Sequence, residues 1–157
     1  MTKTIQNISE CRKLIREVNS AGYYTYADAK KDGKIRPDEE GNIFCRGLGL
    51  TSLKGAPKVV KGIFDCSHNE LRTLHNGPKV VKGSFYCNYN KLDSLEDAPE
   101  KVKGDFYCSH NELTSLEGAP KEVEWDFDCR NNILKGTPEE IKADLRKISN
   151  IKGKIYT

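Results

Sequence analysis

The stretch "DFYCSHNELTSLEGAP", residues 105–120, decides the fold because close copies of it precede it at a fixed step. "SFYCNYNKLDSLEDAP" begins at residue 84 and "IFDCSHNELRTLHNGP" at residue 63, so the step is 21 residues. A constant period of roughly 20–50 residues is the signature of a solenoid, in which each unit packs on its neighbours. The sequence therefore predicts a stack of short, similar rungs.

The repeated letters assign a role to each position of a rung, which reads F-x-C-x-x-N-x-L-x-x-L-x-x-A-P-x-x-V-x-G. Phe and Cys lie two residues apart, so their side chains point to the same face of a short strand, and we expect that face to be the interior. The leucines continue the inner lining. The asparagine turns the chain out of the strand, and its amide can bond backbone groups of the loops above and below. The cysteine position is held by Cys45, Cys66, Cys87, Cys108 and Cys129.

This pattern resembles the leucine-rich repeat, L-x-x-L-x-L-x-x-N/C-x-L, with Phe and Cys at two strand positions, over residues 42 to about 136. The segment "LTSLEGAPKEVEWDFDC" is similar to repeats in proteins encoded by T4-like bacteriophages. The resemblance implies an α/β solenoid with short parallel strands on its concave face. It also implies a phage protein that works in the cytoplasm of the host cell, but it carries no activity by itself.

The two ends of the chain differ from the repeats and read as caps. Residues 1–41 form an N-terminal helical cap and hairpin, residues 42–136 the 21-residue repeats, and residues 137–157 a capping helix and last strand. Ser9 and Gly22 are the expected ends of the first helix. Thr137 is the expected N-cap of the last helix, with Glu140 completing a capping box. "IKGKIYT" echoes V-x-G-x-F-x, so Ile155 is expected in the last rung.

Composition limits the class of protein. Apolar residues are 36% and charged residues 31%, which fits an elongated protein with a thin core. The net charge of +3 is too small to indicate nucleic acid by itself. The sequence has no apolar leader and no run that could span a membrane, so we expect a soluble protein of the cytoplasm without a membrane partner.

Three candidate chemical sites have simpler explanations. The cysteine column lies between Phe and Leu positions, where a thiol packs as a small apolar group and needs no metal. Residues 28–39 place Asp28, Asp32 and Glu39 at calcium-loop positions, but Lys30 replaces a ligand and an Asp-Gly turn explains the segment better. His68 and His110 are two rungs apart, roughly 10 Å, which is too far for shared ligation. We therefore expect no cofactor, no metal and no catalysis.

The positions that vary between rungs carry the functional signal. The side chains that flank Phe and Cys point outward on the concave face, and tyrosines recur there with acids toward the C-terminal end. Exposed aromatic residues rimmed by polar groups are typical of protein interfaces. We expect this face to bind a protein, and Asp105, Asp126 and Asp128 to favour a basic target. The resemblance to phage repeats implies that this protein belongs to the bacterial host. The predicted partner-binding residues are Phe44, Asp65, His68, Tyr86, Tyr89, Asp105, Tyr107, His110, Asp126, Asp128 and Arg130.

Other functions remain open at this point. Nucleic-acid binding would use a lysine-rich edge formed by Lys58, Lys79, Lys121, Lys61, Lys82 and Lys103, although solubilising charge explains that edge as well. Sequestration of a small molecule would need a pocket that an open sheet does not favour. Gly62, Gly83 and Gly104 are expected to supply a tight bend before each strand. Trp125 replaces the bend glycine of its rung and either packs beneath the last helix or anchors an interface. The repeat pattern does not indicate an oligomeric state.

Overall fold

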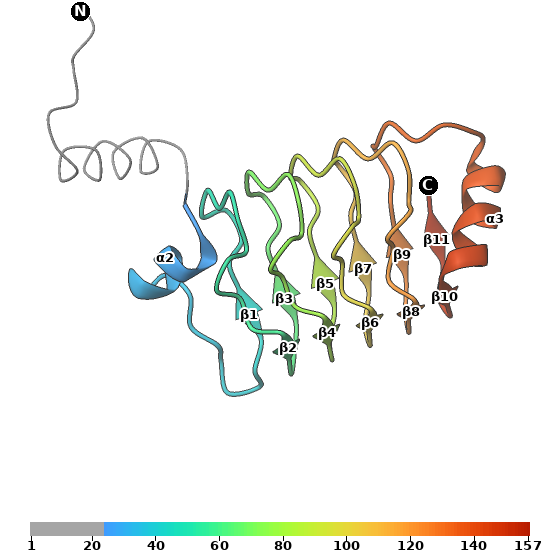
Figure 1. The fold of residues 1–157 in the computed structure, drawn as a ribbon. Coiled ribbons are helices and arrows are strands. Elements are labelled where there is room, and N and C mark those ends of the chain that lie inside the picture. The colour runs from blue at the N-terminus through green and yellow to red at the C-terminus, as the bar shows by residue number, and fades with distance from the viewer. Residues whose placement is uncertain (1–23) are drawn as a thin grey trace, which may run out of the picture.

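A computed structural model describes residues 24–157, which form a parallel β-solenoid (Figure 1). Its strands are two residues long and make two parallel sheets along the coil. The six-stranded sheet has the order β1 (Ile43–Phe44), β3 (Phe64–Asp65), β5 (Phe85–Tyr86), β7 (Phe106–Tyr107), β9 (Phe127–Asp128) and β11 (Ile155–Tyr156). The five-stranded sheet consists of β2 (Val59–Val60), β4 (Val80–Val81), β6 (Lys101–Val102), β8 (Glu122–Val123) and β10 (Asn150–Ile151).

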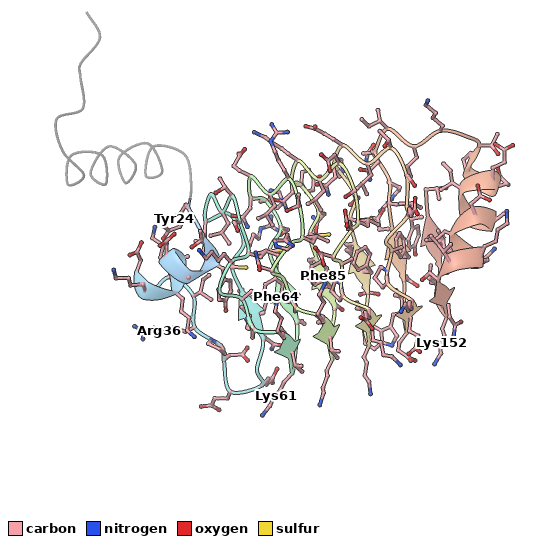
Figure 2. The ribbon with its side chains drawn as sticks, viewed as in Figure 1. Tyr24, Arg36, Lys61, Phe64, Phe85 and Lys152 are labelled. Atoms are coloured by element: carbon pink, nitrogen blue, oxygen red, sulfur yellow. The ribbon has the colours of Figure 1, made fainter. Side chains whose placement is uncertain are left out.

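The interior follows the repeat. The phenylalanine rings stack from rung to rung, with centroids 5.7 Å apart for Phe64 and Phe85, 5.5 Å for Phe85 and Phe106, and 5.0 Å for Phe106 and Phe127. Figure 2 shows Phe64 and Phe85 inside the coil. The five repeat cysteines and the repeat leucines at positions 71, 92 and 113 are also buried. The predicted inward direction of Phe, Cys and Leu is confirmed.

The asparagines hold adjacent rungs together, as the sequence predicts. Asn69 accepts hydrogen bonds through Oδ1 from the backbone N–H of Leu48 and of Leu50, at 3.0 and 2.9 Å. Its Nδ2 donates to the carbonyls of Cys45, one rung earlier, and of Cys66, in its own rung. Asn90, Asn111 and Asn132 repeat this arrangement. A buried polar column thereby satisfies the turns, where the sheet ladder ends.

The bend glycines are required by close approach of successive rungs. A Cβ on Gly83 would lie 2.7 Å from the carbonyl carbon of Gly62 and 2.8 Å from the backbone nitrogen of Ile63. Gly104 meets Gly83 and Ser84 in the same way. Neither glycine has a positive φ. The predicted tight bend is present, and the physical reason for glycine is contact between backbones.

The two helices of the described residues lie at the two ends of the coil. Helix α2 (Tyr26–Lys31) begins at Thr25, whose side chain and that of Asp28 form a capping box. Helix α3 (Pro138–Ile148) has Thr137 as N-cap and Glu140 in a capping box, as predicted, and buries Leu145 in the core. The helix expected between Ser9 and Gly22 lies outside the described residues. The expected hairpin is a turn between Asp38 and Asn42.

The solenoid and its parallel strands are confirmed, and the structure adds a second sheet. The chain returns between successive F-x-C strands through a second two-residue strand, where an α/β repeat would place a helix. The last rung follows α3: β11 pairs with β9 and β10 pairs with β8. Ile155 therefore occupies the predicted last rung. Neither α2 nor α3 has the length or apolar character needed to cross a bilayer.

Candidate functional site: the outer face of the six-stranded sheet

The outward side chains of the six-stranded sheet stand in three rows, which together we call the outer sheet face. The strand row is set directly by the register of the sheet. Its members in order are Phe44, Asp65, Tyr86, Tyr107, Asp128 and Tyr156. The Tyr86 and Tyr107 rings lie 5.2 Å apart at 41°, and both are half-buried, whereas Phe44 is 51% exposed. The structure thus brings Phe44, Tyr86 and Tyr107 into one row, whereas Tyr89, also predicted for this face, lies in the turn row.

Tyr156 belongs to the strand row but was not among the predicted site residues. It pairs with Asp128 in the register of β11 and β9. The guanidinium of Arg130 lies 5.1 Å from the centre of its ring, within reach of a cation–π contact. The signal was present in the sequence, since "GKIYT" aligns with "GDFYC" and puts Tyr156 in the position of Tyr107.

Asp128 is an internal partner of Arg130. It is 6% exposed, and its two carboxylate oxygens accept from Nε and Nη2 of Arg130 at 3.0 and 2.8 Å. Burial opposes ionisation of this carboxyl, but hydrogen bonds from the Arg130 side chain and backbone outweigh it and lower its pKa. The predicted role of Asp128 in attracting a basic partner is therefore weakened, because its charge is already paired.

The entry row lies just before each strand and includes Asp105 and Asp126. Oδ1 of Asp105 accepts from the backbone N–H of Asp126 at 3.1 Å, and Oδ1 of Asp126 accepts from that of Lys154 at 2.7 Å. Ser84 and Asn42 make the equivalent bond in earlier rungs. These acids thus link rungs through one oxygen. The second oxygen of Asp126 accepts from the Tyr156 hydroxyl at 3.3 Å, so Asp126 also borders the strand row.

Asp65 also has an internal role. It is half-buried, and its Oδ1 accepts from the backbone N–H and the hydroxyl of Ser67 at 2.9 and 2.6 Å.

The turn row follows each strand and carries three stacked rings. His68 and Tyr89 have centroids 4.3 Å apart at 17°, and Tyr89 and His110 lie 4.1 Å apart at 9°. The side chain of Asn131 contacts Nε2 of His110 at 3.0 Å. Tyr89 therefore separates the two histidines, as predicted, and the three form one aromatic column. All four residues have a φ of 54° or 55°, in the left-handed region.

Trp125 stands at the margin of the outer sheet face. It is 61% exposed and occupies the bend between β8 and β9, next to Asp126. Packing beneath the last helix is therefore wrong as a prediction, because a ring this exposed is not covered. Anchoring an interface, the alternative, is compatible with its position.

Residues 28–39 and the cysteine column, the two candidate metal sites of the sequence, have structural roles. Asp28 bonds Thr25 at the start of α2, Asp32 accepts from the Tyr24 hydroxyl at 2.8 Å, and Gly33 supplies a turn with φ of 72°. The predicted Asp-Gly turn at Asp32–Gly33 is present. Burial raises the pKa of Cys45 and of Cys129 to about 12, which keeps these thiols protonated. Within residues 24–157 no cluster of three potential ligands could hold a metal ion.

The lysine edge lies along the five-stranded sheet and is only partly free. Lys79 pairs with Asp97 at 2.6 Å, and Lys58 donates to backbone carbonyls of residues 76 and 77. Lys61, Lys82 and Lys103 follow β2, β4 and β6 in register and form no ion pair with any described residue. Figure 2 shows Lys61 and Lys152 at this margin of the coil.

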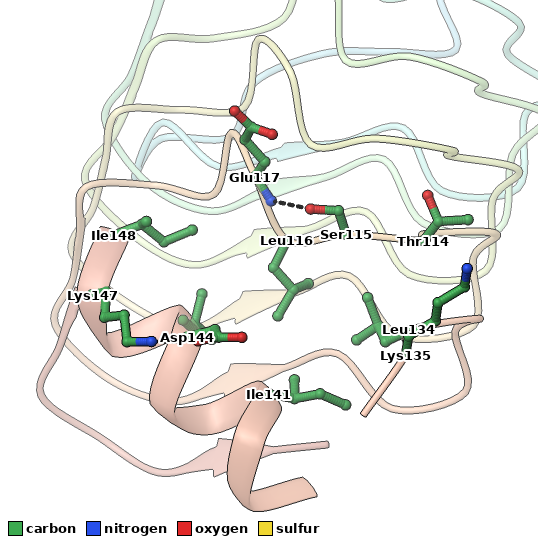
Figure 3. A pocket seen from close by; sticks show the side chains of 11 residues that line it. Thr114, Ser115, Leu116, Glu117, Leu134, Lys135, Ile141, Asp144, Lys147 and Ile148 are labelled. Carbon is green, nitrogen blue, oxygen red and sulfur yellow. Dashed lines mark hydrogen bonds and ion pairs between the residues drawn. The ribbon is translucent and has the colours of Figure 1, made fainter. Parts of the chain in front are cut away.

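A groove lies apart from all of these rows, between α3 and the turns of the last repeats (Figure 3). It has a volume of about 440 Å³ and is half open to solvent. Its floor is formed by Leu116, Leu134, Ile141 and Leu145, and its rim carries both charges, including Glu117 and Lys147. This open and mixed character gives no defined polar site for a small molecule.

Comparisons with protein-family models, with curated proteins and with solved structures find no match to this chain.

Proposed function

We propose that the solenoid is a non-enzymatic binding protein whose outer sheet face recognises another protein. The observation that carries this proposal is the strand row, in which Phe44, Tyr86, Tyr107 and Tyr156 stand in register on one surface. Tyrosine offers a large, stiff contact area together with a hydroxyl, which suits it to the core of an interface. Arg130 contacts the row at Tyr156, and the exposed Trp125 directly precedes Asp126 in the chain. Both residue types are enriched among residues that dominate binding energy.

The chemistry of the partner follows from the charges that remain free. Asp128 is paired with Arg130, and Asp105 and Asp126 each bond a backbone N–H. The face therefore presents aromatic rings within a mildly acidic rim. We propose a partner with apolar and aromatic groups flanked by some basic residues.

The resemblance of the repeat to leucine-rich repeats of T4-like phages supports a more specific form of this proposal. The chain would act in the cytoplasm of an infected bacterium, and the partner would be a host protein, such as a defence or metabolic factor, whose activity it modulates or inhibits. This form rests on the similarity of the repeat alone.

Nucleic-acid binding at the lysine edge is a second candidate, favoured by the register of Lys61, Lys82 and Lys103. These like charges stand one rung apart, about 4.8 Å, and form a row of positive charge along the five-stranded sheet. Their number is small, so binding would be weak and steeply dependent on salt.

The experiment that separates the two is affinity capture from a bacterial lysate. We compare wild type with Tyr86→Ala/Tyr107→Ala and with Lys61→Glu/Lys82→Glu. The proposal expects loss of captured proteins with the tyrosine pair and retention with the lysine pair. Circular dichroism and unfolding midpoints verify that both variants are folded.

Two results would count against protein binding at this face. Capture of the same proteins by the folded tyrosine variant refutes the role of the strand row. Capture that disappears after nuclease treatment, or with the lysine variant only, assigns the function to the lysine edge.

A further inference from the structure

The aromatic column of the turn row ends on an open ring face at His68. Tyr89 covers one face of this imidazole at 4.3 Å, and the second face points toward the preceding rung. In that rung the equivalent position is Gly47, which has no side chain. The backbone confirms the equivalence, because Gly47 N–H donates to Ser67 O just as His68 N–H donates to Asn88 O. The first rung therefore lacks the ring that every rung from His68 to His110 provides.

Within residues 24–157, nothing crowds the first atom of a side chain at Gly47. A Cβ built on Gly47 meets no atom of the described residues within 4 Å. The backbone also has the required form, with φ of 66° at Gly47 and 54° at His68, Tyr89 and His110. The opposite end of the column differs, since the amide of Asn131 contacts Nε2 of His110 at 3.0 Å. The column thus has a polar side chain at one end and, among the described residues, no further aromatic ring beyond His68 at the other.

We propose that the space between Gly47 and His68 is a stacking site for one aromatic side chain of the partner protein. The incoming ring would lie on His68 as Tyr89 does, and would extend the column by one member. This assignment rests on the proposed protein-binding function, and it names a contact that the strand row does not supply. One ring stacked on His68 can anchor the partner protein, because aromatic pairs gain energy beyond the area that they bury.

The surroundings favour a side chain over a nucleobase. Phe44, 51% exposed, and the exposed Arg46 stand in the same rung as Gly47. Asp65 lies beside Phe44 in the register of the sheet. Lys61 and Lys82, which form no ion pair with any residue of 24–157, follow strands of the other sheet. A phosphate backbone would therefore find one arginine and a nearby carboxylate here.

The test uses N-acetyl-tryptophanamide as probe and the ring protons of His68 as reporter in an NMR titration. We expect a saturable upfield shift of these protons, with a dissociation constant on the order of 1 mM for so small a contact. N-acetyl-leucinamide at the same concentration is expected to give no such shift. The variant Gly47→Tyr places a ring of its own in the space, so it should shift His68 upfield without probe and abolish the response to probe.

Gly49→Tyr is the matched control. Gly49 has a φ of 72°, and a Cβ there also meets nothing within 4 Å in the described residues, but it aligns with Glu70, outside the column. It introduces the same side chain at similar backbone strain and should keep the full probe response. Should Gly47→Tyr not fold, a second reporter is the backbone amide of Gly47, which should shift with the probe in wild type. His68→Ala removes the ring platform and should abolish that shift.

Three outcomes overturn the site: an unsaturable shift, an equal response to the leucine probe, or an equal response in Gly47→Tyr. A response to adenosine monophosphate about tenfold stronger than to the tryptophan probe would reassign the site to a nucleobase. Failure of probe stacking leaves capture through Tyr86 and Tyr107 untouched, so this inference and the proposed function can fail separately.

Discussion

Asn90 bonds across the boundary between two rungs: its Nδ2 donates to the carbonyl oxygen of Cys66, one rung earlier, at 3.0 Å. The same carbonyl also accepts from Asn69 at 2.9 Å, and the carbonyls of Cys87 and Cys108 likewise have two side-chain amide donors. The buried N–H of Leu71, in contrast, has no second side-chain acceptor among the described residues. Oδ1 of Asn90 is the partner of the buried Leu71 N–H, at 3.0 Å.

We therefore expect Asn90→Ala to destabilise the protein mainly through Leu71. The Leu71 N–H would remain buried without its acceptor, at a cost of about 1–3 kcal/mol in the free energy of unfolding, and the deleted side chain leaves a small cavity besides. Urea unfolding followed by circular dichroism measures the effect. Asn88→Ala is the control, since the half-buried Asn88 side chain makes no hydrogen bond with the described residues. Equal midpoints for the two variants would contradict this account.

Two phenylalanines on opposite faces of the six-stranded sheet, Phe106 in β7 and Phe44 in β1, should differ sharply in their contribution to stability. Phe106 is fully buried between Phe85 and Phe127, whereas Phe44 is 51% exposed on the outer sheet face. Phe106→Ala should lower the free energy of unfolding by about 3–5 kcal/mol, because transfer and cavity costs add. Phe44→Ala should change it by about 0.5 kcal/mol or less. A large loss in Phe44→Ala would show that its ring has a structural role.

The interior of this fold was predictable from the period, but the second sheet was not. Phe106, Cys108 and Asn111 repeat at one step, and strand alternation fixes which side chains point inward. The strands of the five-stranded sheet, such as Val80–Val81, are two residues long. Alternation cannot be read over two residues, so the repeat valines indicated only an approach to the next strand.

The sequence predicted which residues lie on the outer sheet face, but it did not predict their hydrogen bonds. The register brought Tyr86 and Tyr107 together as expected, but the side-chain bonds of Asp105 and Asp126 depend on where each carboxylate meets the next rung. The left-handed backbone at His68, Tyr89 and His110 was also not evident, because bulky residues rarely adopt it. The aligned Gly47 and Asn131 were the signals for it, since both residue types favour that region.

Close packing of the rungs at Gly83 leads to a third prediction. The added Cβ of Gly83→Ala would meet backbone atoms of Gly62 and Ile63 at 2.7–2.8 Å, and these cannot move without separating β3 from β5. We expect a loss of about 1–3 kcal/mol or more in the free energy of unfolding. Hydrogen exchange should also quicken at Phe64, whose N–H bonds Ser84 O.

The control for this prediction is Gly49→Ala. It is strained by a φ of 72° but meets nothing within 4 Å in residues 24–157. It should cost about 1–2 kcal/mol through the backbone alone and leave the exchange of Phe64 unchanged. Normal protection of Phe64 in Gly83→Ala would show that the rungs can separate locally without breaking the sheet.

The buried thiols should be inert in the folded protein and should make it sensitive to alkali. Burial raises the pKa of Cys45 and of Cys129 to about 12, while unfolded cysteine titrates near its ordinary value of 9.0. A raised folded pKa gives stability that is complete below the unfolded pKa and is lost as the pH rises through the folded one, here from about 9 toward 12.

In a Cys11→Ser background, we expect no reaction with a disulfide reagent at pH 8 before urea and full reaction of the five thiols after it. Burial also raises the pKa of Cys87, so Cys87→Ala should make the fall in stability above pH 9 shallower. Some fall should remain, because burial raises the pKa of Tyr26 to about 12 as well. Rapid labelling of the folded protein at pH 8 would mean that the column opens to solvent far more often than its burial indicates.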